Sequence, residues 1–367
     1  MSTPAVPEPP RAPAPWEAPE RLWLALPAVH PVPGLLAEAR DAVAGLAETL
    51  GAHAPVAVLT DPDDADAARL LPGVVERVPA RGVSPLPGRE GPTFVHAAGT
   101  RGSVEAVHWR LPSNAAGTAG RAAATADAVA RAAGLPLRTP LFSAPAGTWA
   151  ADGDGTAVVS AALLDPAVNA GWTRAQAEDA LAGLLGAETV LWLPPVAGHA
   201  AGPWDRGGAA QAHPHPWLRF VAPGEVAVHW QPGRLHPDHA ASAAALHALT
   251  GARDARGRAL TVRTVRALPP GPDADLEARG PLSALDLLPL APGVVLRPAH
   301  ADSEADAATA EAAAALFPGA EQVPFPGPPL LRLLGTLSDL VLPQPPGART
   351  RRPSPAPAHP EGPRAAP

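Results

Sequence analysis

The segment TVLWLPPVAGHAAGPWDRGGAAQAHPHPWLRFVAPGEVAVHW, residues 189–230, holds two apolar runs on either side of a polar loop. The runs VLWLP and RFVAPGEVAV are rich in β-branched and aromatic residues and contain Pro or Pro-Gly, so they predict buried strands with turns behind them. Three histidines, His199, His213 and His215, lie in the loop between them. Because loop side chains can face a cavity, this arrangement favours a site of chemistry in the loop.

Helical and extended patterns alternate along the rest of the chain. Apolar residues recur with helical spacing in residues 35–50, and the Ala-rich residues 123–133 are followed by Gly134 at the position of a helix C-cap. The pair Asp152-Gly153 predicts a hairpin turn. Further helices are predicted at 65–71, 173–185, 243–249 and 304–317, and further strands at 56–59, 74–78 and 294–298. This alternation is typical of an α/β architecture.

Composition and charge exclude several classes of protein. The chain has 367 residues, 46% of them hydrophobic, which is enough for one large domain or two ordinary ones. A formal charge of −7 argues against nucleic acid or an anionic membrane as a partner, since both need a basic surface. No apolar run approaches the roughly 20 residues of a membrane span. Residues 1–15 lack the pattern of a signal peptide, so we expect a soluble cytoplasmic protein.

The sequence contains no cysteine. A chain without cysteine can form no disulfide, no thiolate metal site and no cysteine nucleophile.

Several motifs, in order along the chain, carry a family resemblance. They are WEAPERLWLALP at residues 16–27, GPTFV at 91–95, DGDGT at 152–156, RFV at 219–221 and ARDARGR at 252–258. The chain thereby resembles the agmatine deiminase and bacterial peptidyl-arginine deiminase family. The corresponding motifs of that family are W-E-P-H-E-R-x-W-x-A-x-P, W-M-R-D-x-G-P-T-F, D-G-x-G-T, G-H-V-D-N-x-x-R-F-V and T-D-A-x-G-R.

The resemblance covers residues 16–346 and implies the pentein fold, a five-bladed α/β propeller of ββαβ modules around a central pocket. Five modules in about 330 residues would have roughly 66 residues each, a plausible size for a repeating unit. We therefore expect one pentein domain at residues 16–346. The Pro/Ala-rich residues 1–15 and the Pro/Arg/Ala-rich residues 347–367 predict a disordered arm and a disordered tail.

The family hydrolyses guanidinium C–N bonds, a reaction linked to putrescine biosynthesis. It uses a thiolate to attack the guanidinium carbon, a histidine to move protons and carboxylates to hold the substrate. The resemblance places Asp339 at the cysteine of G-G-G-x-x-H-C-I-T-Q-Q and His213 at the histidine. It places Arg89, Pro145 and His215 at three guanidinium-binding acids. The resemblance therefore implies that the chain keeps the family's fold but has lost most of its catalytic and substrate-binding residues.

The histidines leave alternatives open. Because the loop is longer than the family's, Gly198-His199 competes with His213 for the family's G-H pair. A metal cluster would draw on His213, His215, His236, Asp238 and His239. These residues lack two histidines four apart on a helix and a matched carboxylate, so we predict neither a metal nor a cofactor.

Three functions follow from the dismantled site. The first is a catalytically inactive family member that retains a central ligand pocket. The others are a divergent hydrolase with Asp339 as nucleophile, and a protein-interaction or scaffold subunit. Since Arg89 and His215 replace acids, a small anion is favoured over a guanidinium as the ligand. If Arg89 instead pairs with Asp339 or Glu90, the pocket binds nothing. The oligomeric state is not predicted.

Overall fold

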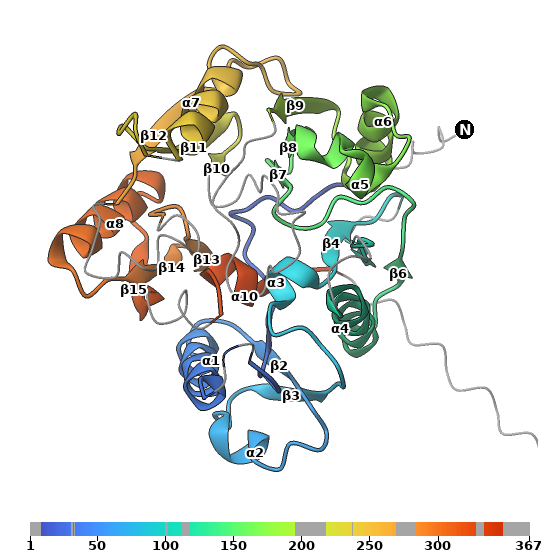
Figure 1. Ribbon diagram of the computed structural model, residues 1–367, viewed down its shortest axis with the longest axis vertical. Helices are drawn as coiled ribbons and strands as arrows, with labels where there is room; N and C mark the ends of the chain where they lie inside the picture. The colour runs from blue at the N-terminus through green and yellow to red at the C-terminus, as the bar shows by residue number, and fades with distance from the viewer. Residues whose placement is uncertain are drawn as a thin grey trace, which may run out of the picture.

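Five small β-sheets surround the centre of the molecule, with the longer helices outside and the short helices α3 (Pro87–Glu90) and α10 (Leu337–Leu340) in the middle (Figure 1). The computed structural model describes residues 9–30, 32, 34–99, 102–111, 117–194, 218–236, 238–268, 283–327 and 334–347. None of the helices in these ranges is long and apolar enough to cross a membrane.

The unit that repeats around the centre is clearest in the fourth sheet. Strand β10 (Leu218–Ala222) turns back at residues 223–224 into the antiparallel strand β11 (Glu225–Trp230). Helix α7 (Asp238–Leu249) then connects to β12 (Thr261–Arg266), which runs parallel to β11. The order of elements is therefore ββαβ, with β11 in the middle of the sheet.

Three more sheets repeat a hairpin, one or more helices and a parallel strand. The second contains β4 (Thr93–His96), β5 (Val104–Val107), α4 (Thr118–Ala133) and β6 (Leu137–Arg138). The third contains β7 (Trp149–Ala151), β8 (Thr156–Ser160), η1 (Ala161–Leu164), α5 (Pro166–Asn169), α6 (Arg174–Leu185) and β9 (Thr189–Leu193). The fifth contains β13 (Leu288–Ala291), β14 (Val294–Ala299), α8 (Ser303–Leu316) and β15 (Glu321–Pro326). The expected ββαβ modules are confirmed.

The first sheet joins the two ends of the described chain. Its parallel strands and their connecting helices are β1 (Arg21–Ala25), α1 (Leu36–Gly51), β2 (Val56–Thr60), α2 (Ala67–Leu70) and β3 (Glu76–Pro79). Its fourth strand, β16 (Leu342–Gln344), pairs antiparallel with β1. The Trp23 indole Nε1 donates a buried hydrogen bond of 2.9 Å to Gln344 Oε1. The last strand thus completes the first module.

Helix ends follow the chemistry of their terminal residues. Helix α6 begins with a capping box, in which Thr173 and Gln176 satisfy each other's backbone N–H groups, and ends at Gly186 with φ 68°. Gly134, with φ 69°, ends α4 as expected. Helix α7 starts at Asp238, earlier than residue 243 where the prediction began it.

Apolar side chains are buried between neighbouring sheets. One cluster combines Leu22 and Leu24 of β1 with Leu290 and Leu296 of the fifth sheet and Leu337 of α10, all of them at most 3% exposed. Burial of a leucine side chain contributes about 2 kcal/mol, so this shared core fixes the first and fifth sheets to each other and to α10.

Residues 9–15 belong to the arm that the sequence predicts to be disordered, and the structure describes them. Residues 9–17 form a strap across the second and third sheets. The Arg11 amide donates to His96 O at 3.0 Å, the His96 amide donates back at 2.8 Å, and the next amide of the strap donates to Leu185 O at 2.9 Å. The strap lacks periodicity because its order comes from backbone hydrogen bonds to distant partners.

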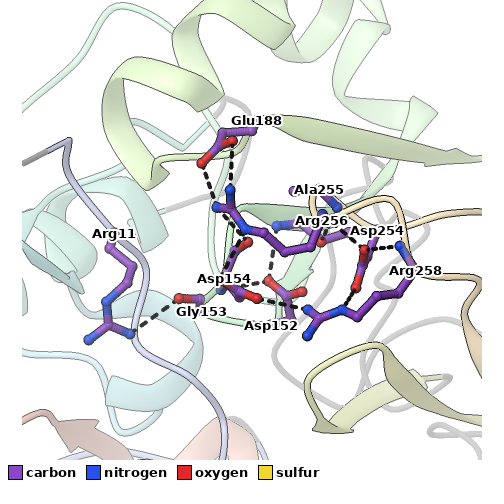
Figure 2. A network of polar contacts seen from close by, with 10 residues as sticks. Arg11, Asp152, Gly153, Asp154, Glu188, Asp254, Ala255, Arg256 and Arg258 are labelled. Carbon is purple, nitrogen blue, oxygen red and sulfur yellow. Dashed lines mark hydrogen bonds and ion pairs between the residues drawn. The ribbon is translucent and has the colours of Figure 1, made fainter.

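Two turns from the third and fourth sheets interlock through charged side chains (Figure 2). Arg256 bridges Glu188 Oε1 at 2.7 Å and Asp154 Oδ1 at 3.2 Å. Arg258 bridges Asp154 Oδ2 at 2.7 Å and Asp254 Oδ2 at 2.5 Å. Exposed ion pairs are weak singly. Asp254, however, has a fully buried side chain. The network therefore holds the two sheets in register.

Candidate functional site at the centre of the ring

The short helices α3 and α10 meet near the centre of the ring (Figure 1). A Cβ atom added at Gly88 of α3 would lie 2.6 Å from the carbonyl oxygen of Val341 and 2.9 Å from that of Asp339. Only glycine permits so close an approach of two backbones. The half-buried Arg89 follows Gly88. The structure thus brings Arg89 and Asp339, two of the predicted site residues, onto adjoining helices.

The carboxylate of Asp339 is used within its own helix. Its Oδ2 accepts a hydrogen bond of 3.0 Å from the Thr336 amide, and the Asp339 amide donates to Thr336 Oγ1 at 3.2 Å. This is a capping box, which satisfies two amides that the helix itself leaves without partners. Asp339 Oδ2 is thus engaged in capping α10.

A second carboxylate, that of Asp286, binds the same helix from the segment before β13. Asp286 Oδ2 accepts from the Leu337 amide at 2.8 Å, and Oδ1 accepts from the Ser338 amide at 3.2 Å and its hydroxyl at 3.0 Å. Burial raises the pKa of Asp286 to about 6 and the charge of Asp339 adds to this, while the hydrogen bonds oppose it. Two carboxylates, those of Asp286 and Asp339, therefore accept hydrogen bonds from amides of α10, where the resemblance places the nucleophile.

Arg219 of β10 supplies a positive charge to this region. Burial lowers the pKa of Arg219 to about 10, and the negative charge of Asp286 acts in the opposite direction. The guanidinium is still protonated at neutral pH. Its Nε is buried and has no hydrogen-bond partner in the part of the chain that the structure describes.

The remaining predicted site residues lie elsewhere or cannot be placed. Pro145 belongs to the loop before β7, where its carbonyl accepts hydrogen bonds from the Thr148 amide at 3.1 Å and hydroxyl at 2.7 Å. Its side chain has no polar atom with which to hold a guanidinium. His213, His215 and the alternative His199 lie outside the described residues.

The fourth sheet contains a buried histidine, His229, that is not one of the predicted site residues. His229 Nδ1 lies 3.1 Å from Ser283 Oγ. Burial lowers the pKa of His229 to about 4, with Asp238 raising it and His236 lowering it, so the imidazole is neutral at pH 7. Among the described residues, no three or more metal-binding side chains are grouped to hold an ion.

Motif matching found Asp339 but missed Asp286 and Arg219. Asp286 reaches its partners across about 50 residues of chain, and no local pattern signals such a contact. Arg219 did carry a signal, because a lone charge inside an apolar strand must find a special environment.

Five ββαβ modules around a common centre, with the first and last strands in one sheet, define the pentein class of α/β folds. The agmatine deiminase of Enterococcus faecalis matches with a TM-score of 0.76 at 20% identity, over 93% of this chain and 96% of that one. The C. jejuni agmatine deiminase matches with a TM-score of 0.75 at 15% identity, over 93% and 98%. At these identities the likeness establishes the fold alone.

The chain belongs to the Porphyromonas-type peptidyl-arginine deiminase family, whose sequence profile matches residues 11–345. It is 34% identical over 267 residues to a Streptomyces coelicolor protein named "Putative agmatine deiminase", covering 70% of this chain and 76% of that protein. A Streptomyces avermitilis protein of the same name is 32% identical over 275 residues, covering 73% and 78%. The family resemblance of the motifs is confirmed.

Proposed function

We propose that the chain is a catalytically inactive member of the agmatine and peptidyl-arginine deiminase family that keeps the centre of its fold for binding a small molecule. The relatives are named as agmatine deiminases. In the family reaction, a thiolate attacks the guanidinium carbon, ammonia leaves, and water releases the ureido product.

The observation that carries the proposal is the state of the nucleophile position. The sequence contains no cysteine. Asp339 stands at that position and its carboxylate accepts the hydrogen bond of a capping box. In a hydrolase that acts through a nucleophile and its base, loss of the nucleophile alone lowers kcat by on the order of 10⁶.

The substrate-holding positions support the same conclusion. A guanidinium is bound by charge-assisted, bidentate hydrogen bonds to carboxylates. Pro145 offers no charge at one of these positions, and the half-buried Arg89 offers a charge of the wrong sign at another. Arg219 adds a further positive charge near the centre. A cationic substrate would therefore lose attraction and meet repulsion.

Activity assays test the proposal directly. Purified protein is incubated with agmatine, arginine and a peptidyl-arginine substrate, and ureido products and ammonia are measured over time. We expect no turnover above the rate without protein, for the wild type and for Asp339→Ala alike. Turnover by the wild type that disappears in Asp339→Ala would establish the divergent hydrolase instead.

The scaffold alternative predicts a different result. A scaffold subunit would be recovered from its native cytoplasm, where we place this protein, with a stoichiometric protein partner, and it would bind no small molecule. Recovery without such a partner, together with binding of a small molecule, favours the ligand-binding function.

A further inference from the structure

The position of Arg219 follows from strand geometry. Side chains of a β-strand alternate between two faces. Leu218 and Phe220 point into the apolar cluster shared with the third sheet. Val221 lies on the other face, in the cluster shared with the fifth sheet. Arg219 therefore faces the fifth sheet, and its strand partner Ala227 belongs to the same cluster as Val221.

Arg219 forms no ion pair with any carboxylate in the part of the chain that the structure describes. Its Nε is buried, and it makes no hydrogen bond within the described chain. The residue as a whole nevertheless keeps part of its surface accessible. The side chain is thus deep enough for burial to lower its pKa, while part of its surface can still be reached by a small ligand. Holding such a charge without an ion-pair partner is unfavourable, and a bound anion would offset this cost.

The nearest carboxylate is committed to another task. Asp286 lies close enough to act electrostatically on Arg219, but the two form neither a hydrogen bond nor an ion pair. Three hydrogen bonds from Leu337 and Ser338 hold both carboxylate oxygens of Asp286 toward α10. Asp286 therefore acts on Arg219 through its charge alone and leaves the hydrogen-bond donors of the guanidinium to other partners.

We propose that Arg219 is the anchor of a binding site for a small carboxylate, located between β10 and the segment that leads into β13. The site rests on the proposed function, since it gives the non-catalytic centre its ligand. Val221 of β10 packs in one apolar cluster with Leu285 and Leu287 of the segment that leads into β13. Arg219 offers a planar fork of donors that matches the two oxygens of a carboxylate.

Charge selects a carboxylate over a phosphate. A single negative charge neutralises Arg219. A phosphate would bring up to a second negative charge toward the carboxylates of Asp286 and Asp339. Burial raises the pKa of Asp286 and the charge of Asp339 adds to this, so further negative charge is unfavourable there. A guanidinium ligand would meet Arg219 itself.

Thermal unfolding and calorimetric titration of the full chain test the site. The probes are the monocarboxylates acetate and propionate, with sodium chloride at equal ionic strength, inorganic phosphate and agmatine as comparisons. We expect the melting temperature of the wild type to rise with carboxylate concentration and to change little with the other probes. No rise with carboxylate, or a larger rise with phosphate, would overturn the assignment.

Variants separate a binding role from a structural role. Arg219→Met removes a charge that has no ion-pair partner among the described residues. The free protein should therefore melt at the same or a higher temperature, with carboxylate affinity reduced about tenfold or more. Arg219→Lys keeps the charge but loses the fork, and should bind more weakly than the wild type. Arg263→Met on β12, an exposed arginine paired with Glu225, is the matched control and should bind normally.

Failure of the carboxylate site and failure of the proposed function give different results. If free Arg219→Met melts well below the wild type, or if carboxylate binds it normally, Arg219 is structural and the inference fails. Turnover of agmatine would refute the proposed function, whatever the carboxylate titration shows.

Discussion

Substituting Gly88 by alanine tests the contact between α3 and α10. The added methyl would stand within 3 Å of the carbonyl oxygens of Val341 and Asp339. These are backbone atoms, which cannot move aside as a flexible side chain can. Overpacking typically costs 1–3 kcal/mol, and because the clash is with backbone we expect about 3 kcal/mol.

The effect converts into a melting temperature. For a domain of about 330 residues, the entropy of unfolding is about 0.7 kcal/mol/K, so a loss of about 3 kcal/mol lowers the melting temperature by about 4 °C. Differential scanning calorimetry measures this shift. Gly45→Ala is the matched control, because a Cβ at Gly45, inside α1, meets nothing within 4 Å. The control should stabilise slightly, by up to about 1 kcal/mol.

The reasoning is refuted if Gly88→Ala melts at or above the temperature of Gly45→Ala. That result would mean that α3 and α10 can separate without cost, so that the centre of the ring is not fixed by their contact.

Other substitutions give distinct expectations. Asp339→Ala removes the capping box and should lower the free energy of unfolding, measured by urea titration, by about 1 kcal/mol. An unchanged urea midpoint would contradict this expectation. Asp254→Ala leaves the Arg256 and Arg258 amides without a buried acceptor. This substitution should lower the free energy of unfolding by about 2 kcal/mol, whereas Asp63→Ala, a control at the surface, should change it little. Asp286 has a folded pKa of about 6, above its ordinary value of 3.8, so its ionisation weakens the fold by about 3 kcal/mol above pH 6 and not at all below pH 4. The free energy of unfolding of the wild type should therefore rise as the pH falls from 6 to 4, and that of Asp286→Asn should not. If both proteins show the same dependence on pH, Asp286 is not the source of the rise. His229 has a folded pKa of about 4, below its ordinary value of 6.5, so its protonation removes about 3 kcal/mol of stability as pH falls from 6.5 to 4. His229→Gln should resist acid better than the wild type, and equal acid sensitivity would contradict this.

Local chemistry made the repeating elements predictable. The capping box of α6, the glycine that ends α4 and the Asp152-Gly153 hairpin are fixed by residues within a few positions of each other, and the structure places them as expected. The start of α7 was missed because Asp238 and His239 precede its alanine run and show no apolar spacing.

The strap and the polar centre could not be predicted in this way. Arg11 owes its order to His96, 85 residues away, and Asp286 owes its position to amides of α10. Such contacts exist only after the sheets have assembled. The family motifs showed which residues stand at Asp339 and Arg89, but not what their side chains bond to.

The pairing of β16 with β1 has a consequence for the order of events during synthesis. A ribosome releases β1 to β3 long before β16 exists, so the first module waits with an unpaired strand edge while the other four modules emerge. An exposed edge is a template for pairing with other chains. Its completion depends on contacts more than 300 residues apart, which form slowly because so long a loop must close. We therefore expect nascent chains truncated before residue 342 to be held by chaperones or to aggregate.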